Sequence, residues 1–302
     1  MRPLFPAHGQ LQVLSTTVLA SHPLTLHPLA SHPFLSGELT SMMTRLSAML
    51  LVLVGTHAAD AQQWRLHEQR GPLEFFSEVP LPLDRLVAEL TAVQTEVNTQ
   101  LKLPDISKTV QIIVFRSMTS YRAYLSTRIP EALNRRAIFY SDGDQSQIYV
   151  VNHSGLVTDL RHEFTHVLLH ESLPFIPLWI DEGVAEFFEQ QPAQRLRSSR
   201  LSAVKWKCRT GWSPDLSRLE NLATASGMTT EDYRDSWAWV HYLLNDSRQT
   251  RSLLQDYLAA ISAGGAPGTF SEWSAARNPT ATKRVGSYFR RFRFSVLSGT
   301  RR

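Results

Sequence analysis

Residues 159–171 read DLRHEFTHVLLHE, and His162, Glu163 and His166 form the pattern H-E-x-x-H within them. Residues four apart project from the same face of a helix, with about 5–6 Å between their Cβ atoms. Two imidazoles placed in this way can bind one Zn²⁺ ion at ~2.0–2.1 Å each. The carboxylate of Glu163, beside the first histidine, can accept a proton from water bound to that metal.

A second acidic segment follows closely, because residues 178–186 read LWIDEGVAE. A catalytic zinc site needs three protein ligands and one open position. Glu182 can supply the third ligand, and Glu186, one turn further on, can accept a hydrogen bond from the outer N–H of a ligand histidine. Pro174 and Pro177 break the chain between the two helices and allow the second to fold back on the first. The alternative is that Glu182 and Glu186 mark only a solvated helix start.

Other histidines are poorer candidates for the third ligand. His170 lies two turns beyond His162, ~12 Å along a straight helix, so the three histidines of this helix cannot bind one ion. His153 precedes the helix and is expected at the surface or in a hairpin. The metzincin spacing H-E-x-x-H-x-x-G-x-x-H is excluded, because Leu169 and Ser172 stand where glycine and histidine are required.

We call the helix expected around residues 159–171 the zinc helix. The segments before it are predicted to form strands and helices, and those after it are predicted to be almost entirely helical. Residues 109–115 (TVQIIVF) are apolar and β-branched, which predicts a strand in the centre of its sheet. The other expected elements are a strand over 73–77, a helix over 84–100, a helix from Ser117 or Thr119 to about 127, and a hairpin of 137–140 with 147–151. We therefore predict an α+β fold with a small mixed sheet and packed helices. The zinc helix is expected at the junction with a helical C-terminal lobe.

The two motifs together, H-E-x-x-H followed by W-[IL]-x-E-G-x-A-E, resemble those of the gluzincin zinc metallopeptidases, the thermolysin-like and aminopeptidase-like clan. The similarity extends over most of residues 72–295. It is strongest for a bacterial group of exported peptidase-MA-like proteins whose substrates are largely undefined. The resemblance implies that His162, His166 and Glu182 bind Zn²⁺ and that Glu163 is the general base. It thus implies an enzyme that hydrolyses peptide bonds in a peptide or protein substrate.

The resemblance also extends to residues that would support the reaction. Glu186 matches a carboxylate beside the ligands of the thermolysin-like pattern, although the acid there is a different one. Gluzincins place a Tyr or His where it stabilises the oxyanion, and the helix expected around 233–243 resembles theirs, which favours Tyr233, with His241 as the other candidate. In the resembled fold, an edge strand, here within 137–151, lines the substrate cleft and pairs with extended substrate. Alternatively, Tyr233 only joins an apolar stripe that faces the core, with Trp237, Val240 and Leu244.

The N-terminal part of the chain reads as a processing signal. Residues 43–61 (MTRLSAMLLVLVGTHAADA) combine one arginine, a short apolar run and an A-x-A cleavage pattern, which predicts a secretory signal peptide removed before Gln62. The apolar run is too short to cross a bilayer. Residues 1–42 are rich in His-Pro pairs and are expected to be a non-native or disordered extension. We expect an exported protein, periplasmic or extracellular, whose residues 62–302 form one catalytic domain, with lobes of 62–181 and 182–302.

The composition of the chain limits the class of protein, the kind of metal site and the partners that can be expected. The 302 residues are 43% hydrophobic and 19% charged, with a net charge of +4, which excludes a disordered chain and gives no argument for a nucleic-acid partner. Cys208 is the single cysteine, so any metal site must be built from His, Asp and Glu. The C-terminal residues 277–302 carry only basic charges and suggest a weak contact with anionic envelope surfaces. The rival to an enzyme is a catalytically silent binding or scaffold protein of the gluzincin fold.

Overall fold

The computed structural model describes residues 64–195 and 198–292. The predicted extension (1–42), the predicted signal peptide (43–61) and the last ten residues of the basic C-terminal run lie outside the described residues. Among the residues that are described, no helix is both long and apolar enough to cross a bilayer.

A five-stranded mixed sheet forms the first half of the described chain. Its strand order is β1-β2-β3-β5-β4, with β2, β3 and β5 parallel and with β1 and β4 antiparallel to their neighbours. The predicted central position of the 109–115 strand is confirmed, and so is the predicted hairpin, which is β4–β5. β1 was not predicted, because its sequence LHEQR lacks a clear apolar alternation and the strand lies exposed at a sheet edge. The strands are β1 (Leu66–Arg70), β2 (Leu73–Ser77), β3 (Val110–Phe115), β4 (Ala137–Ser141) and β5 (Ser146–Val151).

Three helices and one 3-10 turn accompany the sheet: α1 (Leu83–Leu101), α2 (Met118–Leu125), η1 (Pro130–Ala132) and α3 (Leu156–Ser172). The apolar stripe predicted for 84–100 is buried along α1, at Leu86, Leu90, Val93 and Val97. Ser117 caps α2, as one of the two predicted alternatives has it, and its side chain accepts a hydrogen bond from the backbone N–H of Ser120.

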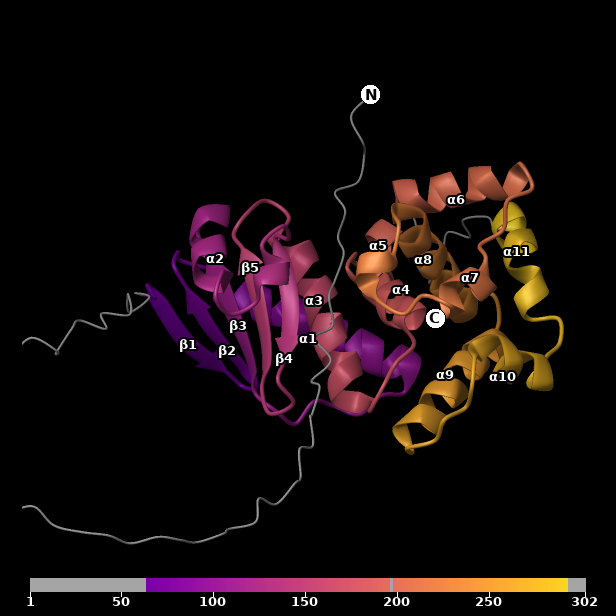
Figure 1. Ribbon diagram of the computed structural model, residues 1–302, viewed down its shortest axis with the longest axis horizontal. Helices are drawn as coiled ribbons and strands as arrows, with labels where there is room; N and C mark the ends of the chain where they lie inside the picture. Colours follow the sequence, from indigo (N-terminus) through magenta and orange to yellow (C-terminus); the bar gives the residue numbers. More distant parts are fainter. Residues whose placement is uncertain (1–63, 196–197, 293–302) are drawn as a thin grey trace, which may run out of the picture. The chain divides into compact units, whose positions relative to one another are not determined.

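The motif helix α3 lies between the sheet and the C-terminal helices. It packs against β4 and β5 on one side and against α1 and α4 (Leu178–Phe188) on others, and Figure 1 shows it between the strands and the orange helices. Its residues from Asp159 to Leu169 are all buried. A helix buried all round has no solvated face, so its charged side chains must find partners inside the protein.

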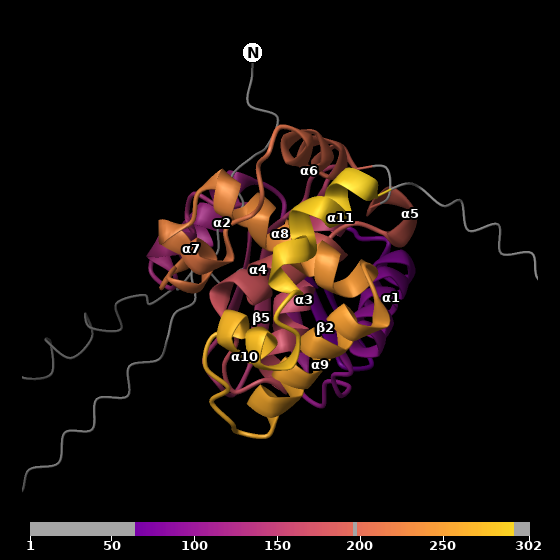
Figure 2. The same ribbon diagram turned by 90° about the vertical axis from the view of Figure 1, so that its right-hand side faces the viewer.

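The C-terminal half is helical, as predicted, and Figure 2 views it with α9, α10 and α11 nearest to the reader. Its α8 begins with a capping box in which Thr229 and Asp232 each bond to the other's backbone N–H. One continuous apolar core joins these helices to α1, α3 and the sheet. The elements after α4 are α5 (Pro192–Arg195), α6 (Ser199–Arg209), α7 (Leu216–Glu220), η2 (Ala225–Gly227), α8 (Thr230–Asn245), α9 (Arg248–Ser262), α10 (Phe270–Arg277), η3 (Thr282–Arg284) and α11 (Val285–Arg291).

A glycine lets α4 and α8 approach each other closely. A Cβ atom added at Gly183 would lie 2.6 Å from the backbone oxygen of Ser236 and 2.8 Å from a methyl carbon of Val240. Both distances are far below van der Waals contact, and a helix backbone cannot move aside cheaply. Gly183 directly follows Glu182, so this packing fixes where the predicted third ligand stands.

Substituting Gly183 with alanine is therefore expected to lower the free energy of unfolding by about 1–3 kcal/mol, because the added methyl group overpacks the α4–α8 contact. Zinc affinity should fall as well, because Glu182 moves with the helix. Denaturant unfolding and zinc titration would measure the two effects. Gly227→Ala is the control, since its nearest neighbour would be 3.8 Å away, and it should change stability by less than about 0.5 kcal/mol. Equal stabilities of the two variants would contradict the packing argument.

Candidate metal centre

Helix α4 carries an unusual concentration of buried acid. Asp181 and Glu182 are each 1% exposed, and Glu186 and Glu189 are nearly as deeply buried. Burying a carboxylate is costly unless a cation or hydrogen-bond donors compensate it. The helix therefore requires positive partners from the elements packed against it, and α3 supplies two histidines on the facing side.

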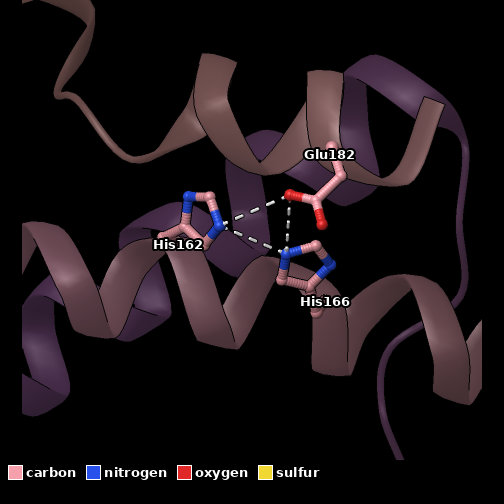
Figure 3. Close-up of side chains that lie close together, drawn as sticks. All are labelled: His162, His166 and Glu182. Carbon is pink, nitrogen blue, oxygen red and sulfur yellow. Dashed lines mark hydrogen bonds and ion pairs between the residues drawn. The ribbon is translucent and has the colours of Figure 1, made fainter. Parts of the chain in front are cut away.

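The structure brings His162, His166 and Glu182 together, as the motif spacing predicts. The two Nε2 atoms are 3.3 Å apart, and each lies 3.9 Å from Oε2 of Glu182. Figure 3 shows both imidazoles rising from one helix while the carboxylate descends from the other. Three donor atoms from two rigid helices thus face a common point.

This donor set fits a zinc ion. Within the described residues, both oxygens of Glu182 are buried without a hydrogen-bond partner, an arrangement that a bound cation would stabilise. Tetrahedral bonds of ~2.0–2.1 Å would hold ligand atoms ~3.4 Å apart, close to the separation of the two Nε2 atoms. Two histidines and one glutamate are also the ligand set of a known class of catalytic zinc sites, which leave one position open.

The outer nitrogens of both histidines meet carboxylates. Nδ1 of His166 is 2.6 Å from Oδ1 of Asp181, whose other oxygen is 3.0 Å from Nε2 of His170. Nδ1 of His162 is 3.3 Å from Oε2 of Glu189. An Nδ1–H that donates to a carboxylate leaves Nε2 with its lone pair. The two Nε2 atoms lie 3.3 Å apart, within hydrogen-bond distance, so one of them carries a proton when no metal is bound, and a cation between them would take the place of that proton.

Glu186 is not the carboxylate that takes this role. It was predicted to accept a hydrogen bond from a ligand histidine, but Asp181 and Glu189 make those contacts. Glu186 instead forms an ion pair with Arg200 of α6, which also lies 3.3 Å from Glu189. The sequence offered a weak signal for Glu189, since it lies seven residues, or two turns, beyond Glu182. It offered none for Arg200, because a loop separates the two helices.

The protonation of the centre reflects an excess of carboxylates. Burial opposes a charge on His162, but the hydrogen bond with Glu189 and the charge of Glu163 raise its pKa to about 10. Burial raises the pKa of Glu182 well above its usual value, although His162 lowers it. Without another cation, the centre holds protons on groups that normally bind metals in their deprotonated form. A divalent ion would supply the same positive charge in place of those protons.

Arg161, beside the first ligand, ties the two ligand helices together. Its guanidinium is 2% exposed and donates to the backbone oxygens of Phe188, Glu189 and Gln190 at 3.1–3.4 Å. These carbonyls close the C-terminal end of α4, where a positive charge is favourable. Arg161 also pairs with Glu89 of α1.

Asp181→Asn is expected to lower zinc affinity by about 10- to 100-fold, because the amide holds His166 less firmly and leaves its Nε2 less basic. Competition with a coloured chelator would measure the affinity. Asp159→Asn is a matched control, since Asp159 is a buried carboxylate of α3 that pairs with His153 and Arg136. A control that loses as much affinity as Asp181→Asn would show a general effect on folding instead.

Glu163 is fixed against the edge of the sheet. Its Oε2 accepts a hydrogen bond of 2.8 Å from the backbone N–H of Phe139, in β4. The side chain is 5% exposed and belongs to the same helix turn as His162 and His166. The predicted general base is therefore oriented by β4, which pairs on one side only, with β5, in the described sheet.

The two oxyanion candidates differ sharply in their surroundings. Tyr233 has a buried hydroxyl that finds no hydrogen-bond partner in the described part of the chain. Burial, then the charge of Glu182, raise its pKa far above the usual range, so Tyr233 lies close to the ligand cluster and stays protonated. The predicted apolar stripe is also confirmed, since Tyr233, Trp237, Val240 and Leu244 are all buried.

His241 lies among aromatic rings. Its nearest rings are Trp237, Phe289 and Phe292, and its Nδ1 is 3.0 Å from the hydroxyl of Tyr288. Burial lowers its pKa to about 3, which keeps the ring neutral. These contacts make His241 part of the packing between α8 and α11, and they do not bring it to the ligand cluster.

No protein-family model matches this chain, and no curated protein is similar to it at a significant level.

Proposed function

We propose that the protein is a zinc-dependent metallopeptidase of gluzincin type, in which His162, His166 and Glu182 bind the ion. The observation that carries this proposal is the buried carboxylate of Glu182, which has no hydrogen-bond partner in the described chain and faces two imidazole nitrogens. Such an arrangement is costly without a cation. The sequence of 43–61 supports export as part of the proposal.

Zinc, when bound, would supply a Lewis acid that activates water and polarises the substrate carbonyl. Glu163 would take the proton from the attacking water and pass it to the departing amine. The hydrogen bond from Phe139 supports this role, because it holds one carboxylate oxygen in place and limits rotation of the side chain.

Tyr233 would donate a hydrogen bond to the oxygen that becomes negative during the reaction. Its buried hydroxyl has no hydrogen-bond partner in the described chain, which supports this role, because such a donor can stabilise a charge that appears only during the reaction. His241 is not proposed for this task, since its contacts lie within the aromatic core.

The edge of β4 that pairs with no other strand of the described sheet supports an extended peptide as the substrate. An edge strand offers unpaired backbone N–H and C=O groups to another chain. The N–H of Phe139 in this strand already bonds to Glu163, so a peptide along β4 would lie beside the proposed base.

Metal content and proteolysis together test the proposal. We expect about one zinc per chain by elemental analysis, and cleavage of an unstructured protein such as casein that stops with a chelator and returns with zinc. A folded, zinc-loaded protein that cleaves neither casein nor a broad peptide library would instead support the catalytically silent binding or scaffold protein.

A further inference from the structure

Arg135 stands just before the edge strand β4. It lies two residues before β4 and is half-buried. Within the described residues, its guanidinium makes no hydrogen bond and no ion pair, whereas the neighbouring Arg136 pairs with Asp159 at 3.4 Å. A half-buried, unpaired guanidinium is costly in a folded protein.

The surroundings of Arg135 are those of the candidate metal centre. Its charge interacts with Glu163, Glu182 and the hydroxyl of Tyr233. Burial lowers the pKa of Arg135, and these neighbours offset that effect only in part. Arg135 is therefore close enough to the centre to feel its charges, but it forms an ion pair with neither glutamate.

The backbone around Arg135 is firmly anchored. The hydroxyl of Tyr121 donates to the oxygen of Ala132 at 3.4 Å, and Nε of Arg122 donates to the oxygen of Leu133 at 2.8 Å. The N–H of Arg135 itself donates to the oxygen of Ala132 at 2.9 Å. These contacts fix the backbone of Arg135, so a ligand would have to order only its side chain.

The position along β4 relates Arg135 to the bond that would be cut. Phe139, which holds Glu163, follows Arg135 by four residues, ~13 Å along an extended strand. The arginine side chain is long enough to cover part of that distance. A group that reaches Arg135 from a peptide on β4 would therefore lie within about four residues of the cleaved bond.

We propose that Arg135 binds a carboxylate of the peptide substrate and so makes the protein selective for peptides that carry one near the cleaved bond. This inference rests on the proposed peptidase function. The guanidinium has a planar fork of N–H donors that matches a carboxylate in two parallel hydrogen bonds. The carboxylate belongs either to the substrate's C-terminus or to an acidic side chain.

Two matched pairs of short, unstructured peptides test the inference and separate the two sources. The first pair lacks acidic side chains and differs only in a free or an amidated C-terminus. The second pair is amidated and differs only in an internal Glu or Gln. With zinc-loaded protein, we expect the charged member of at least one pair to show about 10- to 100-fold higher kcat/KM. The pair that shows the preference identifies the source.

Variants then assign the preference to Arg135. Arg135→Gln is expected to abolish most of the preference, mainly through KM, and Arg135→Lys to retain part of it, because lysine keeps the charge without the fork. Arg136→Gln removes the same charge one residue away and should retain the full preference. Two results would overturn the inference: cleavage without preference in either pair, or a loss in Arg135→Gln that is equal for charged and neutral peptides.

A binding measurement keeps this test separate from the proposed activity. Calorimetry on the zinc-loaded Glu163→Gln protein reports affinity for the same peptides without turnover. Tighter binding of a charged peptide that Arg135→Gln removes would support the inference, even if the wild-type protein cleaved nothing and the proposed function failed. Equal binding of charged and neutral peptides would overturn it.

Discussion

Glu163→Gln is expected to lower kcat/KM by about 10²–10⁴-fold while the zinc content stays near one ion per chain. The amide keeps the size of the side chain, but it cannot take a proton from water, and general-base catalysis typically contributes a factor of this size. Glu163 is not among the three residues that face the common point, so the ion should remain bound. Elemental analysis and a peptide-cleavage assay on the same preparation would measure both quantities.

Glu171→Gln provides the matched control for this experiment. Glu171 lies on the same helix, but its carboxylate accepts a hydrogen bond from Ser146 and lies 3.5 Å from Lys108. The Glu171→Gln variant should therefore cleave peptides at the wild-type rate. A Glu163→Gln protein that cleaves at the wild-type rate would exclude Glu163 as the base, and one that loses its zinc would show that Glu163 supports the ligands.

We expect the effect of Glu182→Gln on stability to depend on zinc. The variant should be at least as stable as the wild type without zinc and less stable than the wild type with zinc. The variant without metal should melt at or above the temperature of the wild type without metal, because the amide replaces a buried carboxyl group whose oxygens have no hydrogen-bond partner in the described chain. With zinc 100-fold above the dissociation constant, the wild type gains about 2.7 kcal/mol, or roughly 5–10 °C in Tm. The variant should gain almost nothing. Thermal melts with zinc and with a chelator would show the reversal.

Glu220→Gln is the contrasting control for this reversal. Glu220 accepts hydrogen bonds from both the backbone N–H and the hydroxyl of Ser271. Its substitution should lower stability equally with and without zinc, because its carboxylate already has partners. A Glu182→Gln protein that gains as much stability from zinc as the wild type would rule out Glu182 as a ligand.

Local patterns in the sequence predicted most of the fold and the core of the centre. The buried side of α1 follows from helical periodicity, the position of β3 from its β-branched run, and the meeting of His162 with His166 from their spacing. Glu182 follows from the same logic, because two proline breaks bring its helix back onto α3. In each case the information lies within a few turns of one segment.

The contacts that the sequence did not predict depend on distant segments. Arg200 reaches both Glu186 and Glu189 from a helix beyond a loop, and Glu189 also meets His162. No local pattern specifies that an arginine from α6 will pair with the acids at the end of α4. Arg135 was overlooked for the same reason, because only the packed sheet brings it near Glu163 and Tyr233.

Arg161 of α3 holds the C-terminal end of α4 through hydrogen bonds that do not depend on a bound metal ion. Its hydrogen bonds to Phe188, Glu189 and Gln190 involve none of the three residues that would bind zinc. The spacing of the two ligand-bearing helices is therefore maintained by the polypeptide itself. Removing the ion would leave an intact apoprotein that is ready to be reloaded, so metal supply could switch such a protein off and on without refolding.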